Sequence, residues 1–163
     1  MNKGEVKLTF LICGPPKSGT TSLYEYMREH PDVAMSSGKE PKFFFKKYDK
    51  GIDWYYQEYF SHYDGETAVG EASAENINRQ KVPRRLKRHV PDAKLIFTLR
   101  DPVERLWSHY QHAVNVGYFH PKRGFSKIIR SEENEWVKWQ KNIGMYLEHL
   151  KRYEKYFERS QMK

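Results

Sequence analysis

The sequence of 163 residues has little cysteine and no long hydrophobic run. Its single cysteine, Cys13, has no partner for an internal disulfide, which excludes an extracellular disulfide scaffold. No window approaches the roughly 18 apolar residues of a membrane span. The N-terminus, with charged residues before a short apolar run, lacks the form of a signal peptide. We therefore expect a soluble, cytoplasmic protein in which Cys13 packs in the core.

The composition also lacks the features of a disordered chain. Hydrophobic residues make up 38% and aromatic residues 15% of the sequence, against 31% charged residues. There is no internal repeat and no low-complexity linker, so we expect a single domain over residues 1–163. The formal net charge of +8 fits a polyanion, an anionic cofactor or an acidic substrate, without choosing between them. The oligomeric state is not readable.

Strand and helix patterns alternate along the chain. Strands are expected at about 7–13, 66–70 and 94–99, and helices at about 20–30, 51–60, from 82 onward, 102–115 and 143–157, with a loop at about 31–51. This order predicts an α/β fold, a parallel sheet with helices on both faces. Ligands of such sheets bind beyond the carboxyl ends of the strands, where Gly14–Thr21, Glu71–Glu75 and Arg100 fall.

The first of these loops reads GPPKSGTTSL (residues 14–23) and follows an apolar strand. Gly14 and Gly19 keep the spacing of a phosphate-binding loop, but Thr20 occupies the usual lysine position and Lys17 lies inside the loop. Inward-facing N–H groups and the positive end of the next helix favour a phosphate-like anion. Further donors come from Thr20, Thr21 and Ser22.

A second pattern is a strand that ends at Arg100 and is followed by a helix. Asp101 is expected to cap this helix, with Pro102 at its first position and Glu104 completing a capping-box pattern. Arg100 and Ser108 on the helix can bind one phosphate together. Alternatively, Arg100 pairs with a carboxylate and Ser108 is a helix-face residue.

Three segments together resemble the sulfotransferases that use 3′-phosphoadenosine 5′-phosphosulfate (PAPS). They are PKSGTTSL (16–23), LIFTLRDPVERLWSHY (95–110), and KEPKFF (39–44) with KGIDWY (50–55), of which the last pair is similar to the heparan-sulfate-type enzymes and their bacterial relatives. The resemblance implies a P-loop-like, nucleotide-kinase-like fold and transfer of a sulfuryl group from PAPS to an acceptor hydroxyl or amine, without a metal. It implies that the 5′-phosphosulfate is bound by Lys17, Ser18, Gly19, Thr20, Thr21 and Ser22, that Arg100 and Ser108 bind the 3′-phosphate, and that Glu40 is the catalytic base.

The sequence departs from this family in two respects. Ala72 stands where heparan-type enzymes commonly have a lysine, and Lys42, at a position where they often have histidine, can substitute for it. Glu71 and Ser73 line the acceptor site or cap the local turn. The family's domain also continues beyond this chain with a strand and a basic loop. We therefore expect a fragment or a reduced member of the family, with weak or absent turnover and an exposed apolar face on its last helix.

Two other functions remain open. A nucleoside-triphosphate kinase or hydrolase would need a lysine after Gly19 and an acidic magnesium ligand, which are not in their usual places. A non-catalytic polyanion-binding module would use Lys46, Lys47 and Arg84–Arg88. The basic segment 84–89 also has the spacing of a solvated helix face. We expect no nucleic-acid partner, and the acceptor is not readable, although a carbohydrate is favoured.

Overall fold

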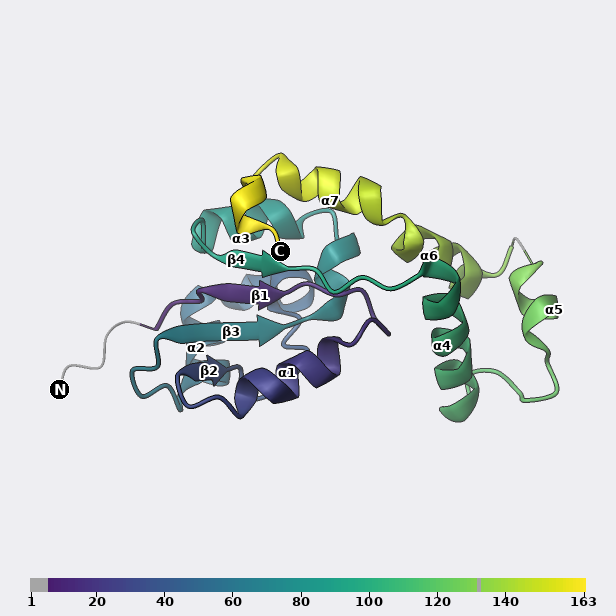
Figure 1. The fold of residues 1–163 in the computed structure, drawn as a ribbon, viewed down its shortest axis with the longest axis horizontal. Coiled ribbons are helices and arrows are strands. Elements are labelled where there is room, and N and C mark those ends of the chain that lie inside the picture. Colours follow the sequence, from purple (N-terminus) through teal and green to yellow (C-terminus); the bar gives the residue numbers. More distant parts are fainter. Residues whose placement is uncertain (1–5, 132) are drawn as a thin grey trace.

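The computed structural model describes residues 6–131 and 133–163. Strands and helices alternate through the first two thirds of the chain, and helices follow (Figure 1). The elements are β1 (Phe10–Ile12), α1 (Thr20–Arg28), β2 (Val33–Met35), α2 (Ile52–Phe60), β3 (Ala68–Ala72), α3 (Val82–His89), β4 (Lys94–Ile96), α4 (Pro102–Asn115), α5 (Phe125–Ile129), α6 (Glu135–Gly144) and α7 (Tyr146–Glu154). A π-helix (Phe43–Lys47) and short 3₁₀ turns lie between them.

The strands of the described residues form one parallel sheet in the order β2-β3-β1-β4. This confirms the predicted parallel α/β fold. Strand β3 begins two residues later than expected, and β1 and β4 are shorter. Strand β2 lies inside a segment predicted to be a loop, and that prediction was wrong. Its three residues carry little strand signal of their own, and pairing with β3 holds them extended.

The two faces of the sheet carry different layers of the core. Phe10 and Ile12 of β1 point toward α1, where they pack with Tyr24 and Met35. Leu11 and Cys13 point to the opposite face, because successive side chains of a strand alternate. That face is covered by the π-helix, α2, α3 and α7, which contribute Phe43, Phe44, Tyr55, Phe60, Val82, Leu86 and Tyr153. Cys13 is fully buried, as predicted.

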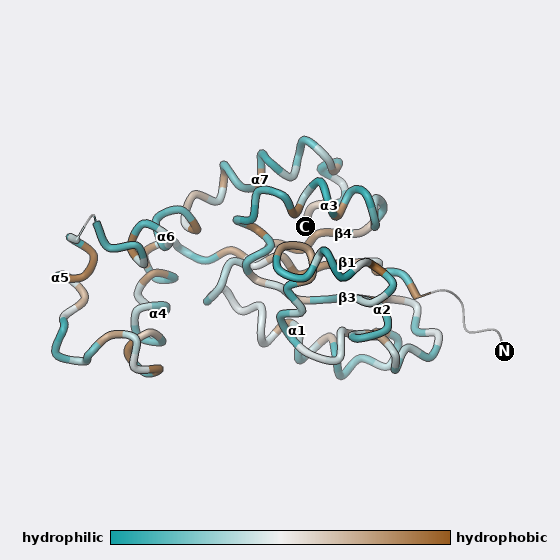
Figure 2. The backbone as a smooth tube through the Cα atoms, turned by 180° about the vertical axis from the view of Figure 1, so that it is seen from behind, coloured by the Kyte–Doolittle hydropathy of each residue, from teal (hydrophilic) through white to brown (hydrophobic). Residues whose placement is uncertain are grey.

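Helices α4, α5 and α6 form a separate cluster beyond one end of the sheet (Figure 1). Its buried centre is made of Tyr110, Phe119, Ile128, Trp136 and Val137. In Figure 2 the hydrophobic part of α5 is visible within this cluster. Within the described ranges, no helix combines the length and apolar character needed to cross a bilayer.

The helix predicted over 143–157 is interrupted. Helix α6 ends at Gly144, Met145 leaves the helical conformation, and α7 begins at Tyr146. The break redirects the apolar face, so that Tyr153 and Phe157 are buried in the main core. The expectation that this face is exposed was therefore wrong for these two residues, although Leu147 is 65% exposed. Beyond α7, Met162 lies beside Leu95 of β4 in a parallel bridge.

Glycine at position 70 is required by the sheet. A Cβ atom there would lie 2.2 Å from the ring of Phe10, its partner on β1. We predict that Gly70→Ala lowers the free energy of unfolding by on the order of 1–3 kcal/mol, because the buried ring of Phe10 would have to move away from the new methyl group. Gly38→Ala is the matched control, since nothing lies within 4 Å of a Cβ at that position. Urea unfolding measures both, and equal stability of the two variants would contradict the packing argument.

Candidate functional site

The loop between β1 and α1 turns sharply because three of its residues have positive φ angles. Gly14, Lys17 and Gly19 have φ values of 61°, 69° and 83°. A Cβ at Gly14 would lie 2.5 Å from both Cα and the carbonyl oxygen of Ala74, so only glycine allows the two segments to approach. Lys17 is not a glycine, and a left-handed lysine is uncommon. Lys17 is thus held in a backbone conformation that a residue with a side chain does not favour.

The loop leads into a helix end that is open to an anion. Gly19 caps α1 without a side-chain hydrogen bond, and the first turn has no acidic residue. Its N–H groups therefore lack an intrahelical partner and carry the positive end of the helix dipole. The Ser18 hydroxyl oxygen is buried without a hydrogen-bond partner among the described residues. Thr20 is buried, whereas Thr21 and Ser22 are exposed at the helix surface.

Glu40 lies beside this loop, at the end of the segment that follows β2. Its backbone is also left-handed, with φ 61°, and its N–H donates to the carbonyl of Ala72 at 2.8 Å. One carboxylate oxygen, Oε1, accepts from the backbone N–H of Ala74 at 3.1 Å and from Lys39 Nζ at 3.0 Å. The other, Oε2, is buried and has no partner among the described residues. The carboxylate is thus fixed in direction with one oxygen unused.

The residues after β3 hold Glu40 and Lys42 in place. The Ser73 hydroxyl accepts from the backbone N–H of Lys42 at 3.2 Å. The Lys42 ammonium lies 3.5 Å from Glu75 Oε1, and Glu75 also pairs with Arg79. The backbone of Lys42, like that of Glu40, is left-handed, with a φ of 57°. Ser73 and Lys42 therefore lie in the same loop cluster as Glu40.

Glu71 lies deeper than these residues. It is fully buried, and its carboxylate accepts from Tyr55 Oη at 2.8 Å and from Asn76 Nδ2 at 3.0 Å. Burial raises the pKa of the Glu71 carboxyl from 4.5 to about 7; the two hydrogen bonds oppose the increase and the nearby charge of Glu40 adds to it. Both donors are side chains and neither is a backbone N–H, so the turn-capping role and the acceptor-site role of Glu71 both stay predictions.

Arg100 and Ser108 lie at the start and in the middle of the α4 segment. Asp101 accepts from the N–H groups of Val103 and Glu104 at 2.9 and 3.0 Å, which confirms the predicted cap. The Glu104 carboxylate lies 3.3 Å from Arg100 Nε, so it pairs with the arginine and does not complete the expected capping box. Arg100 is exposed and Ser108 is half-buried.

His109 of α4 was not singled out from the sequence. It follows Ser108, packs against the rings of Trp136 and Trp139, and has a buried Nδ1 without a partner among the described residues. Burial, together with the smaller effects of the charges of Arg105 and Lys17, lowers the pKa of its imidazole from 6.5 to about 4. In the sequence, only its position next to Ser108 distinguished His109, and no motif includes the residue after that serine.

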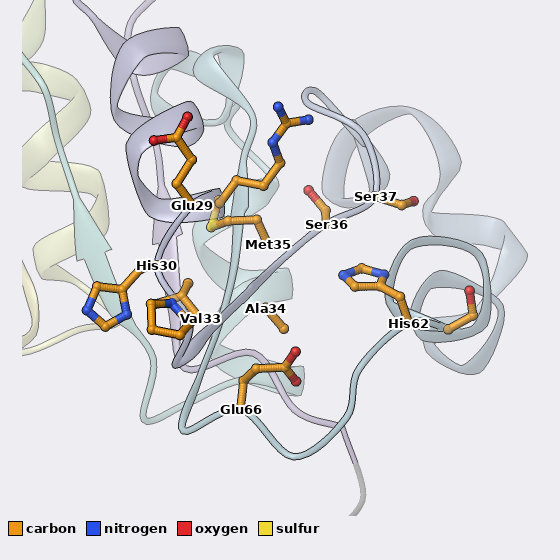
Figure 3. A pocket seen from close by; sticks show the side chains of 12 residues that line it. Glu29, His30, Val33, Ala34, Met35, Ser36, Ser37, His62 and Glu66 are labelled. Carbon is orange, nitrogen blue, oxygen red and sulfur yellow. The ribbon is translucent and has the colours of Figure 1, made fainter.

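A cavity in the described part of the chain lies elsewhere. It has a volume of about 510 Å³ and runs along β2, lined in part by Glu29, His30, His62 and Glu66 (Figure 3). None of the predicted site residues lines it. Within residues 6–131 and 133–163, no group of three His, Cys, Asp or Glu side chains is arranged to hold a metal ion. We therefore place the candidate site by the loop geometry at the carboxyl ends of the strands, and not by cavity size.

Glu71 and His109 predict opposite dependences of stability on pH. Between about pH 4.5 and 7 the folded protein keeps a proton on Glu71 that the unfolded chain has lost, so this contribution falls as pH rises. Between about pH 4 and 6.5 the unfolded chain protonates His109 while the folded protein does not, so that contribution rises with pH. Glu71→Gln should therefore gain stability with pH more steeply than the wild type, by on the order of 1–3 kcal/mol between pH 4.5 and 7.

Urea unfolding at a series of pH values measures this difference. The slope is compared, and not the absolute stability, because glutamine changes the hydrogen bonding to Asn76. Glu29→Gln, at an exposed position, is the control and should follow the wild-type curve. Parallel curves for Glu71→Gln and the wild type would show that Glu71 is ionised in the folded protein.

Comparison with known proteins identifies the family. The model of the sulfotransferase domain matches residues 8–163. The chain is 34% identical over 150 residues to heparan sulfate glucosamine 3-O-sulfotransferase 6 of Mus musculus, covering 90% of this chain and 43% of that protein. It is 39% identical over 107 residues to the membrane-associated sulfotransferase kil1 of Dictyostelium discoideum, covering 64% of this chain and 23% of that protein.

A solved structure agrees with these matches. The crystal structure of a sulfotransferase from Alicyclobacillus acidocaldarius superposes with a TM-score of 0.79 at 30% identity, covering 98% of this chain and 72% of that one. The chain spans less than half the length of the two curated relatives above. The match over nearly all of its residues and the shared fold confirm the resemblance seen in the sequence, and the chain belongs to the sulfotransferase domain family.

Proposed function

We propose that this chain transfers a sulfuryl group from PAPS to a hydroxyl or amine of an acceptor. The single observation that carries the proposal is the position of Glu40: a fixed carboxylate with one unused, buried oxygen beside an anion-binding loop that contains Lys17. When bound, PAPS would supply the sulfuryl group, and adenosine 3′,5′-bisphosphate would remain as the product.

The residues of the first loop fit the 5′ end of this nucleotide. The N–H groups from Gly19 to Ser22 and the unpartnered Ser18 hydroxyl are donors for phosphate oxygens. Lys17 adds a positive charge where the bond to the leaving phosphate breaks. Donors fixed in advance stabilise developing charge without reorganisation, so they favour the transition state over the ground state.

Arg100 and Ser108 are proposed to bind the 3′-phosphate. Arg100 is exposed and pairs only with Glu104 at 3.3 Å among the described residues. An exposed ion pair of this kind contributes little stability, so the guanidinium can exchange Glu104 for a phosphate at low cost. A phosphate also offers more acceptor oxygens to the planar guanidinium than one carboxylate oxygen does.

Glu40 is proposed to accept the proton of the attacking acceptor group. Oε1 is held by the Ala74 N–H, which leaves Oε2 as the atom that receives the proton. Lys42 and Ser73, which lie next to Glu40, are proposed to contact the acceptor, with Glu71 beneath them. Ala72 is fully buried, and Lys42 is proposed to take the place of the family's lysine. The name of the 3-O-sulfotransferase relative supports a carbohydrate acceptor.

Transfer and binding measured side by side test this function. Candidate acceptors are incubated with PAPS and analysed by mass spectrometry for added sulfate. Glu40→Gln should lower turnover while nucleotide affinity stays within about twofold, because the variant keeps the shape of the side chain and removes only the proton acceptor.

Lys17→Ala should lower turnover by on the order of 10²–10³, as expected for the loss of one electrostatic contact to the transition state. Wild-type turnover in a folded Lys17→Ala protein would contradict the proposed function.

If Arg100 binds the 3′-phosphate, the protein should prefer nucleotides that carry this phosphate. Adenosine 3′,5′-bisphosphate should bind on the order of tenfold to a hundredfold more tightly than 5′-AMP, because 5′-AMP leaves the guanidinium without its anion. Arg100→Ala should reduce the affinity for the bisphosphate toward that for 5′-AMP and change 5′-AMP binding little. Calorimetry at one fixed salt concentration measures these affinities. Equal affinities in the wild type would contradict PAPS as the donor, and tighter binding of magnesium ATP would favour a kinase.

A further inference from the structure

The basic segment Arg84–His89 has no role in the proposed transfer reaction. It forms most of α3, whose tube is strongly hydrophilic in Figure 2. Val82 and Leu86 point into the core, which leaves the arginines on the outer side of the helix. Arg84, Lys87 and Arg88 are exposed, as expected for a solvated helix face, and Arg85 is half-buried.

Three of these arginines line one cavity. Arg84, Arg85 and Arg88, together with Tyr48 from the turn after the π-helix, surround a volume of about 360 Å³. No carboxylate of residues 6–131 and 133–163 lines this cavity. None of the three guanidinium groups forms an ion pair with a described residue. Three guanidinium groups therefore lie around the cavity without a carboxylate of a described residue to neutralise their charge.

One of the three arginines is held in place. Arg85 Nη1 donates to the carbonyl of Phe44 at 2.7 Å, and its guanidinium lies 4.0 Å from the centre of the Tyr48 ring. The Tyr48 hydroxyl is within 2.8 Å of His89 Nε2, which fixes the ring. Side chains that are ordered before a ligand arrives lose less conformational entropy on binding. Arg85 and Tyr48 are therefore ordered on one side of the cavity before an anion binds.

We propose that α3 and the turn at Tyr48 form a second oxyanion site, which binds a sulfate or phosphate group. Guanidinium groups bind tetrahedral oxyanions through paired N–H donors, and several of them can share one dianion. None of the residues that line the cavity belongs to the Gly14–Gly19 loop. The site is therefore separate from the proposed nucleotide site and does not depend on the proposed function.

The bound group has two possible sources, a free ion or an ester on a larger molecule. A neighbouring cavity shares Arg85 and extends to Arg79. Arg79 pairs with Glu75, which also pairs with Lys42 beside Glu40. A molecule bound in the neighbouring cavity could therefore carry an ester group to Arg85. The test must therefore distinguish inorganic ions from esters.

Nuclear magnetic resonance of the whole chain tests the proposal. The Nε–H signals of Arg84, Arg85 and Arg88 are followed while inorganic sulfate replaces chloride at constant ionic strength. We expect a saturable shift of the Arg85 signal in the wild type and in Lys17→Ala. The double variant Arg84→Gln/Arg88→Gln should bind sulfate at least about tenfold more weakly, because each charged hydrogen bond contributes a factor of this size. A parallel titration compares inorganic phosphate with glucose 6-phosphate.

Lys87→Gln is the matched control. It removes one positive charge from the same helix, but Lys87 lies on the side of α3 that faces Phe157. This variant should bind sulfate as the wild type does. Tighter binding of glucose 6-phosphate than of phosphate would assign the site to an ester, and equal binding to a free ion; both support it. A linear, unsaturable shift of Arg85, or equal weakening in Lys87→Gln and the double variant, would overturn the proposal.

The outcome is independent of sulfuryl transfer. If nucleotide binding fails but the Arg85 signal saturates with sulfate, the oxyanion site stands and the proposed function does not. If the nucleotide binds and Arg85 does not respond, the reverse holds. The Lys17→Ala protein separates the two sites, because it removes the loop lysine and leaves every residue of the arginine cavity unchanged.

Discussion

The close approach of Gly14 to Ala74 is the contact on which the candidate site depends. The first loop and the turn after β3 meet here with no room for a side chain at position 14. The same turn donates the Ala74 N–H that orients Glu40. One steric constraint therefore places the proposed anion loop and the proposed base side by side, although 26 positions separate Gly14 from Glu40 in the sequence. Parallel pairing of β1 with β3 brings the two segments to the same edge of the sheet.

A buried polar network supports this contact from below. Glu71 accepts hydrogen bonds from Tyr55 and Asn76, and the Asn76 carbonyl accepts from Tyr153 at 2.7 Å. A carboxyl in such a position is costly unless its hydrogen bonds are satisfied. The network joins α2, β3 and α7, so elements far apart in the chain fix the turn that carries Ser73 and Ala74. Rigid support of this kind is what positioned catalytic groups require.

Three residues in the loops of the proposed site have a left-handed backbone conformation. Lys17, Glu40 and Lys42 are the only non-glycine residues with positive φ among the described part of the chain. Such conformations cost on the order of 1–3 kcal/mol each and persist where the surroundings determine them. All three belong to the loops of the proposed site, and two of them are proposed to act in transfer. The local cost is consistent with selection for the direction of these side chains.

The sequence by itself determined the family, the parallel α/β class and the elements with strong local signals. Helix α1 begins where a glycine loop ends, and α4 begins at the Asp101 cap; both depend on residues a few positions apart. The candidate residues Lys17, Glu40, Arg100 and Ser108 were likewise readable, because they lie within contiguous motifs. These features need no knowledge of distant contacts.

Only the tertiary structure decided the remaining features. Strand β2 exists because β3 pairs with it, and the break at Met145 turns Tyr153 and Phe157 into a core formed mostly by the first 97 residues. The burial of Glu71, the packing of His109 against Trp136 and Trp139, and the cavity that Tyr48 shares with three arginines also join separate segments. Their physical reason is the same: packing and pairing energies between distant residues outweigh the weak preferences of each segment, and a local pattern carries no record of them.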